Sequence, residues 1–371
     1  MKKSLVIVFI VLFLVLFGYV FFLNYYKRGQ EQNKIPVSRF SPLKKTGSSA
    51  KILSVSKNYK ISVYDPQTQA LTLLPIQVET SIRTQDGTTG AISSPDNKWV
   101  AYIDKITNEV WIIDSDGNNK TQISKQHLTE TTNTYGTTLL ISGISSDDHF
   151  LVFKVIVGNE LGGDTSNKLK PSILRGFYLA DLSQGKVYFL ANLPSYLDFI
   201  PNTHKVVFES DYRRKRLYSY NVETGAVEKI TTGDPLRSLT LQYSFSADNH
   251  VAYTTGSINR STSQIYYATL DNLQEQIIDQ GGWADLQWPL ISPDNKRLAY
   301  EKLTPLGLKK VILYDLISGQ KTDLGVSKDI IYWFDNQNLV AMGGPYGGPW
   351  TLELIRLNHS STTIAHDQAL R

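Results

Sequence analysis

A short motif recurs along this chain, and its repetition constrains the fold more than any other feature of the sequence. SPDNKWVAY (Ser94–Tyr102) and SPDNKRLAY (Ser292–Tyr300) are nearly identical, and SADNHVAY (Ser246–Tyr253) is a close third copy. Weaker copies are SSDDHFLVF (Ser145–Phe153), IPNTHKVVF (Ile200–Phe208), FDNQNLVA (Phe334–Ala341) and FSPLKKTGSSAKILSV (Phe40–Val55). Successive copies begin 42 to 55 residues apart, a period typical of propeller blades.

The residue types of the motif predict a turn followed by a strand. Ser and Asp side chains accept main-chain hydrogen bonds in turns, Pro presets the first central dihedral, and Asn tolerates the left-handed conformation. The apolar run that follows, ending in Ala-Tyr in the best copies, is typical of a strand. Since a short apolar segment also precedes each turn, every unit is expected to open with a hairpin.

The second half of each unit repeats as well. It consists of an apolar run, a turn led by Asp or Asn, and a more polar run, as in VWIIDSDGNNKTQIS (Val110–Ser124) and VILYDLISGQKTDLG (Val311–Gly325). This pattern predicts a second hairpin, and therefore four strands per unit. Repetition without a long helical pattern indicates an all-β propeller rather than a sandwich. We predict seven four-stranded blades; six blades closed by strand exchange are the alternative, because Phe40–Val55 lacks a clear inner strand.

These motifs resemble a known repeat family. SPDNK followed by an apolar run and Ala-Tyr, together with the hairpin at Ile112–Ile123, is similar to the repeat signature of TolB-like, WD-related propellers. The resemblance extends roughly from Phe40 to Ala365 and is specific for the fold. Members of that family serve as protein-docking platforms in the bacterial envelope and as gating propellers of prolyl-oligopeptidase-type peptidases, so the resemblance does not select one function.

The N-terminal segment has the features of a membrane anchor. Leu5–Leu23 carries no charge and would span about 28 Å as a helix, close to the hydrocarbon thickness of a bilayer. We predict a retained transmembrane helix within residues 1–28, a polar tether over 29–39 and the propeller over 40–371. A cleaved signal peptide is the alternative, but it would have a shorter apolar region and a small-residue cleavage site. The short N-terminal tail favours a propeller outside the cytoplasmic membrane.

Charge and composition narrow the classes of partner. The chain has 38 Lys and Arg against 34 Asp and Glu, a net charge of +4, and no basic stripe with interleaved aromatic residues, so no nucleic-acid partner is expected. The absence of cysteine rules out disulfides, thiolate metal sites and a cysteine nucleophile.

The sequence contains no complete catalytic or metal-binding motif among those considered. Asp114–Asn118 (DSDGN) begins like a calcium loop, but Lys125 stands where a bidentate Glu is required, so we predict a hairpin turn. His149, His204 and His250 occupy the turn position that is Lys in other repeats, which places them in separate blades and argues against a shared metal site. Neither a G-x-S-x-G nor an H-E-x-x-H motif occurs. We therefore assign no catalytic residue, metal or cofactor.

The loops between second and third strands differ most in length and are the expected binding region. In a propeller they emerge on the same face as the links between blades, and variable loops on a rigid scaffold are where binding residues concentrate. The alternative is that the long loops are tolerated insertions, which cost little stability. Arg and aromatic residues are enriched at binding hot spots. The candidates are Tyr212, Arg213, Arg214, Trp283, Tyr346 and Trp350. The remaining tryptophans, including Trp288 and Trp333, are expected to pack between blades.

These features favour a non-catalytic binding platform outside the cytoplasm. Its expected partner is another envelope protein, a peptide or a glycan. The alternative is a hydrolase or lyase with its site in the central funnel of the propeller.

Overall fold

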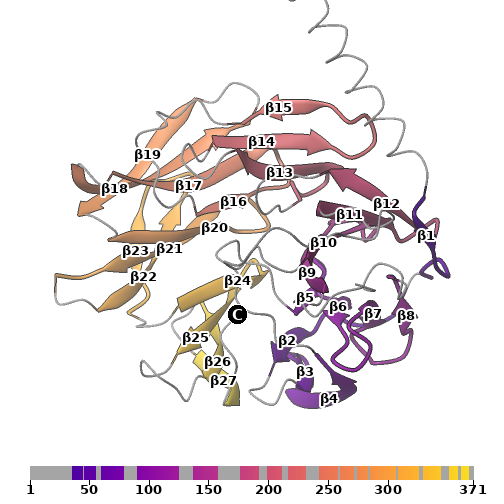
Figure 1. Cartoon of the computed structure of the whole chain (residues 1–371). Helices are drawn as coiled ribbons and strands as arrows, with labels where there is room; N and C mark the ends of the chain where they lie inside the picture. Colours follow the sequence, from indigo (N-terminus) through magenta and orange to yellow (C-terminus); the bar gives the residue numbers. More distant parts are fainter. Residues whose placement is uncertain are drawn as a thin grey trace, which may run out of the picture.

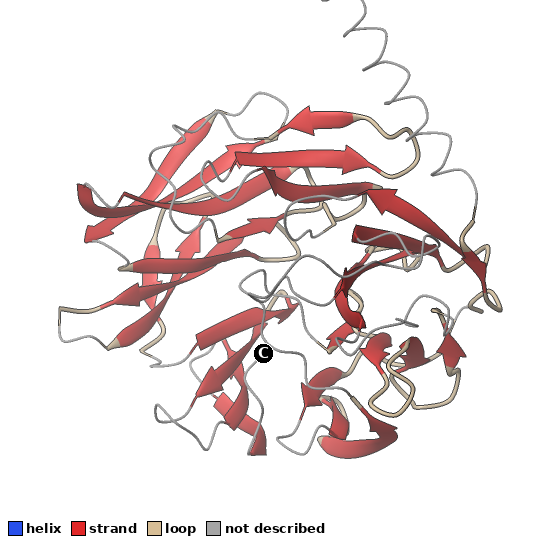
Figure 2. Ribbon diagram, in the orientation of Figure 1, coloured by secondary structure: helices blue, strands red, loops and turns tan. Residues whose placement is uncertain are grey.

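The apolar runs that follow the repeated turns form strands, and the strands form seven sheets around a common centre (Figure 1). The described part of the chain consists of strands, turns and loops, without a helix (Figure 2). This computed structural model describes residues 36–44, 46–55, 60–78, 90–124, 137–157, 176–191, 199–210, 216–230, 242–257, 260–270, 274–282, 285–305, 308–325, 329–343, 351–357 and 361–366. These residues contain no helix that could span a membrane, and the expected anchor Leu5–Leu23 lies outside them.

Five sheets contain four consecutive antiparallel strands, numbered here as blades in chain order. Blade 2 consists of β5 (Ala91–Ser93), β6 (Trp99–Ile103), β7 (Val110–Asp114) and β8 (Thr121–Gln122). Blade 3 consists of β9 (Thr137–Ile144), β10 (Phe150–Val157), β11 (Gly176–Asp181) and β12 (Lys186–Ala191). Blade 5 consists of β16 (Tyr243–Phe245), β17 (His250–Ser257), β18 (Arg260–Thr269) and β19 (Glu275–Gly282). Blade 6 consists of β20 (Leu286–Ile291), β21 (Arg297–Leu303), β22 (Lys309–Asp315) and β23 (Lys321–Asp323). Blade 7 consists of β24 (Asp329–Asp335), β25 (Asn338–Gly343), β26 (Thr351–Arg356) and β27 (Ser361–His366).

The other two blades show three strands each within the described residues. Blade 1 consists of β2 (Ile52–Val55), β3 (Lys60–Asp65) and β4 (Ala70–Gln77). Blade 4 consists of β13 (Lys205–Ser210), β14 (Arg216–Asn221) and β15 (Val227–Lys229), and an isolated bridge from Phe199 to Val206 lies where the innermost strand runs in other blades. The seven-bladed propeller predicted from the repeats is therefore confirmed.

The core lies between the blades, because the second and third strands of a blade are covered on both faces. All five residues of β6 are buried. Trp99 and Ala101 belong to the apolar cluster shared with blade 3, whereas Val100 and Tyr102 belong to the cluster shared with blade 1. Successive side chains of a strand alternate between faces, so a strand buried on both faces must be apolar throughout. This explains the uninterrupted apolar run in the repeat.

The ring closes through side-chain packing between the last blade and the first. Ile52 and Tyr64 of blade 1 share an apolar cluster with Val340, Leu352 and Leu354 of blade 7. Apart from β1, the strands of each described sheet follow one another along the chain. No described sheet joins strands of blades 1 and 7. Within the described residues, closure therefore rests on packing rather than on an exchanged strand.

The repeated motif forms the same hydrogen-bonded turn in four blades. The Ser hydroxyl donates to the Asp two residues later and accepts a main-chain N–H at the start of the next strand, as Ser292 does with Asp294 (2.7 Å) and Arg297 (3.0 Å). The residue after the Asp has positive φ in these copies: Asn97, Asp148, Asn249 and Asn295. These turns and the turns between third and fourth strands lie at one end of the blades, which we call the short-turn end.

The segment that precedes β2 contacts blades 3 and 2 before the chain enters blade 1. We call residues 36–44 and 46–51 the N-terminal strap. β1 (Ser38–Arg39) adds a fifth strand to blade 3 beside β12 (Figure 1). The Phe40 N–H then donates to Gly185 in the last turn of blade 3, and Lys51 donates its N–H to Asn97 of blade 2. Ser38 and Arg39, at the end of the predicted tether, are thus part of the folded propeller.

Candidate functional site

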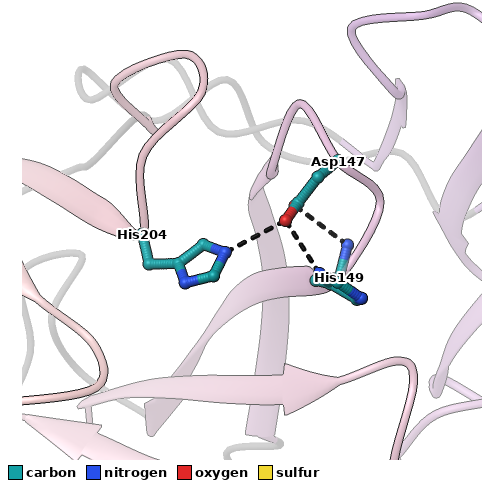
Figure 3. Close-up of side chains that lie close together, drawn as sticks. All are labelled: Asp147, His149 and His204. Carbon is teal, nitrogen blue, oxygen red and sulfur yellow. Dashed lines mark hydrogen bonds and ion pairs between the residues drawn. The ribbon is translucent and has the colours of Figure 1, made fainter.

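Two histidines and one aspartate from neighbouring blades meet at the short-turn end (Figure 3). Asp147 Oδ2 lies 2.8 Å from His149 Nδ1 and 3.0 Å from His204 Nε2. The three ligand-type atoms all lie within 4.8 Å of one another. Within the described ranges, this is the one group of three or more His, Cys, Asp or Glu side chains close enough to share an ion. We call Asp147, His149 and His204 the histidine–aspartate cluster.

Contacts between two turns place His204 beside blade 3. The Asn202 N–H donates to Ser146 Oγ at 2.6 Å, and the Ser146 hydroxyl lies 3.3 Å from Asn202 Oδ1. These bonds tie the first turn of blade 4 to the first turn of blade 3. His204 follows two residues after Asn202, so its ring reaches Asp147 across the blade boundary.

Two further residues, Glu223 and Phe150, contact the His204 imidazole. Glu223 Oε1 lies 2.7 Å from His204 Nδ1, on the side of the ring that faces away from Asp147. The Phe150 ring meets the His204 ring edge-on, with centroids 4.8 Å apart. The His149 side chain is about half exposed, at 52%, and that of His204 is 29% exposed. The cluster is therefore ordered by its neighbours but open to solvent.

The hydrogen bonds in the cluster decide its electrostatics. Burial alone would raise the pKa of Asp147, but hydrogen bonds from Ser145, His204 and His149 outweigh it and hold that pKa well below its usual range. Burial works to lower the pKa of His204, but the hydrogen bonds to Asp147 and Glu223 outweigh it and raise that pKa. At neutral pH the cluster therefore keeps a charged carboxylate next to the two rings.

Asp148, next to the cluster, has a different environment. It occupies the left-handed turn position that is Asn in three other copies, with φ of 58°. Burial, followed by repulsion from Asp96 of blade 2, raises the pKa of Asp148 to about 7. Its buried Oδ1 makes no hydrogen bond to any described residue.

The arrangement modifies one expectation from the sequence. His149, His204 and His250 do lie in the turns of separate blades, as predicted. Separate blades do not keep them apart, however, because the turns of blades 3 and 4 touch and bring His149 and His204 within 6.2 Å, measured between ring centroids. His250 bonds to Asp248 instead and stacks on Tyr267. Spacing in the sequence does not reveal which neighbouring turns are in contact.

Of the other sequence predictions about site residues, one is confirmed and the rest concern residues that the structure does not describe. Asp114–Asn118 forms the turn between β7 and β8, as predicted, and Asp114 Oδ1 accepts the Asn118 N–H at 2.8 Å. The candidate binding residues all lie outside the described residues, so they stay predictions: Tyr212, Arg213, Arg214, Trp283, Tyr346 and Trp350.

Trp288 is an exposed aromatic residue that sequence reasoning assigned to the core. It lies in β20, at the edge of the sheet that faces the first strands of the neighbouring blades, and is 48% exposed. Its φ is 50°, and the pairing of β20 with β21 is irregular between Gln287 and Leu290. A bulky residue with positive φ is strained and is rarely kept without a reason. Pro289 was the available signal, because proline within a strand often marks a bulge.

Comparison with known proteins shows the fold and leaves the function open. No family model matches the chain, and no curated protein matches it. An oligogalacturonate lyase from Vibrio parahaemolyticus matches with a TM-score of 0.59 and 12% identity, over 88% of this chain and 93% of that chain. An oligogalacturonate lyase in complex with manganese matches with a TM-score of 0.56 and 14% identity, over 86% of this chain and 96% of that chain. TolB from Acinetobacter baumannii matches with a TM-score of 0.46 and 15% identity, over 83% of this chain and 77% of that chain. At these identities the likeness shows a propeller fold.

Proposed function

We propose that this chain is a membrane-anchored propeller that binds a partner outside the cytoplasm without catalysing a reaction. The partner would be another envelope protein, a peptide or a glycan. The observation that carries the proposal is Trp288, an aromatic side chain held in a strained, half-exposed position on the innermost strand of blade 6.

Several contacts keep Trp288 in place. The main-chain N–H of Trp288 donates to the side-chain oxygen of Gln242 in blade 5, and the main-chain N–H of Ile291 donates to Ser244 Oγ at 3.1 Å. Blade 5 thus stabilises the bulge that exposes the indole. Aromatic rings are frequent anchors at binding sites because they offer a large rigid surface at a small entropic cost. Peptides and sugar rings are ligands that such a surface can stack against.

The experiment is recovery of the partner from solubilised membranes with tagged full-length chain. Trp288→Ala should lose the partner while the melting temperature stays close to that of the unsubstituted chain. Ile317→Ala is the control, because Ile317 is also exposed, at 79%, but lies in a turn at the short-turn end of the same blade. Unchanged recovery with Trp288→Ala would refute this site.

The loop residues extend the proposed surface. Arg213 and Arg214 lie between β13 and β14 in the sequence, and Tyr346 lies between β25 and β26, so we expect them in loops between second and third strands. Their joint replacement by Ala should reduce partner recovery without lowering the melting temperature. Retained recovery would confine binding to the ring interior around Trp288.

The proposed location rests on the apolar run Leu5–Leu23. Protease treatment of spheroplasts should remove the propeller, and the mature chain should retain its N-terminal segment by mass spectrometry. A protected propeller, or a chain that begins near residue 25, would contradict the anchored topology.

A lyase or hydrolase in the central funnel is the second candidate. It is favoured by the two oligogalacturonate lyases, which match over more than nine-tenths of their own length. A lyase that acts by β-elimination leaves a conjugated double bond, which ultraviolet absorbance detects. Incubation of the purified chain with oligogalacturonate, with and without manganese, separates the two candidates: turnover would replace the docking proposal.

A further inference from the structure

We propose that the histidine–aspartate cluster binds a divalent transition-metal ion of the zinc type. Asp147, His149 and His204 would supply three ligands, and a fourth position would remain open to water or to a group from a partner. The site lies at the short-turn end, so it is separate from the docking surface proposed above and does not depend on it.

The three ligand atoms converge without rearrangement of the backbone. Asp147 Oδ2 is 2.8 Å from His149 Nδ1 and 3.0 Å from His204 Nε2. Zinc binds nitrogen and oxygen at about 2.0–2.2 Å, so ligand atoms around it lie slightly more than 3 Å apart. Small side-chain rotations that widen the present contacts would admit the ion. The three side chains already face one another across the blade boundary (Figure 3).

The count of hydrogens on His204 leaves room for a cation. Both ring nitrogens face carboxylate oxygens, Nδ1 that of Glu223 and Nε2 that of Asp147. When this imidazole is neutral it carries one N–H, and one of the two contacts then lacks a hydrogen. A metal ion between His204 Nε2 and Asp147 Oδ2 could take the place of that hydrogen, because both atoms offer it a lone pair. A second proton could fill the same contact, so metal and proton would compete for it.

Glu223 occupies the position of a supporting group in metal sites. Histidines that bind metals commonly donate their other N–H to a carboxylate, which fixes the tautomer and the orientation of the ring. The 2.7 Å contact between Glu223 Oε1 and His204 Nδ1 has this geometry. It would leave the lone pair of Nε2 directed at the ion.

The identity of the ligands selects the class of metal. Two imidazole nitrogens and one carboxylate oxygen suit zinc and neighbouring transition metals, whereas calcium and magnesium prefer oxygen ligands throughout. Three protein ligands with an open fourth position are also the usual number in zinc sites that act on or hold another molecule.

Blade 5 contains a natural control. Asp248 and His250 repeat the Asp-x-His spacing of Asp147 and His149, and His250 Nδ1 lies 2.9 Å from Asp248 Oδ1. His250 stacks on Tyr267 with the rings nearly parallel, 4.9 Å between centroids. Within the described residues no second histidine joins this pair. The pair therefore tests whether Asp-x-His alone binds the ion.

The experiment is titration of the metal-free, full-length chain in mild detergent with Zn²⁺, followed by calorimetry. We expect His149→Ala and His204→Gln each to remove one zinc ion per chain relative to the unsubstituted protein, whereas His250→Ala keeps it. Glu223→Gln should weaken zinc affinity by about 10-fold to 100-fold. Cobalt bound at the same site should give visible absorption bands that His149→Ala abolishes.

The outcome that overturns the proposal is equally specific. Identical zinc stoichiometry and affinity in the unsubstituted chain and in His149→Ala would exclude the site, as would an equal loss in His250→Ala. If His204→Gln lowers the metal-free melting temperature, His149→Ala decides, because the His149 side chain is 52% exposed and its removal leaves the turn intact.

Discussion

Ser115 donates its hydroxyl hydrogen to the main-chain oxygen of Ser49 at 2.8 Å, although the two residues are 66 positions apart. The bond joins the N-terminal strap to the last turn of blade 2. Together with the β1–β12 pairing, it makes the strap contact blades 3 and 2 before the chain enters blade 1 at β2. Contacts of this kind resist separation of blades 1, 2 and 3, so release of the strap should lower the stability of the whole ring.

Gly185→Ala tests the contribution of the strap. Gly185 has φ of +65°, and a Cβ there would overlap the main-chain oxygen of Phe40. Gly319→Ala is the matched control, because Gly319 has φ of +72° at the same turn position of blade 6, and among the described residues a Cβ there would contact only the Tyr314 hydroxyl, at 3.4 Å. Both variants should lose about 1 kcal/mol from the left-handed backbone, and Gly185→Ala should lose at least about 1 kcal/mol more.

Urea denaturation measures this difference, and trypsin cleavage at Arg39 reports release of the strap. Faster cleavage is expected in Gly185→Ala and not in Gly319→Ala. Equal stability losses in the two variants would show that the strap contributes nothing.

Trp333 and Trp288 should differ sharply in their effect on stability. Trp333 is 8% exposed, lies in the cluster between blades 6 and 7 and donates its indole N–H to the main-chain oxygen of Leu290 at 2.9 Å. Trp333→Ala should cost about 3–5 kcal/mol. Trp288→Ala should cost about 1 kcal/mol or less, because its side chain is half exposed. Comparable losses in urea denaturation would contradict the assignment of Trp288 to binding.

Glu301 should make the propeller less stable as pH rises. Burial raises the pKa of Glu301 from 4.5 to about 7, with Lys309 opposing the shift and Asp329 adding to it. Between these two values the folded chain binds the proton that the unfolded chain has lost, so stability falls with increasing pH. The total loss is at most about 3 kcal/mol.

Urea denaturation at a series of pH values from 4.5 to 8 measures this slope. Glu301→Gln should flatten it, because the amide stays uncharged. Glu228→Gln is the control, since the Glu228 side chain is 59% exposed. An unchanged slope in Glu301→Gln would assign the pH dependence to other groups.

Asn295 tests the backbone requirement of the repeated turn. Its φ is 54°, and its buried Oδ1 accepts no hydrogen bond from the part of the chain that the structure describes, so the residue is suited to this position mainly by its tolerance of the left-handed conformation. Asn295→Ala should therefore cost about 1 kcal/mol or more, whereas Asn295→Gly should change the free energy of unfolding by less than about 0.5 kcal/mol. Thermal and urea denaturation should agree in this order; a reversed order would refute the argument.

Much of the fold could be predicted from the sequence, because its determinants are local. Ser292, Asp294 and Asn295 form their turn through hydrogen bonds within six residues, and the apolar run after it needs only a blade on each side. Seven such units therefore predicted seven blades. The site could not be predicted in the same way, because His149 and His204 are brought together by a contact between two turns, Ser146 with Asn202.

The sequence by itself determined the strand order, the turn chemistry and the number of blades, since these depend on residue types at short spacing. Tertiary structure alone decided that the strap crosses blades 3 and 2, that Trp288 is exposed, and that two histidines share Asp147. Each of these depends on the distance between neighbouring blades, which is set by how side chains pack between the sheets and leaves no periodic trace along the chain.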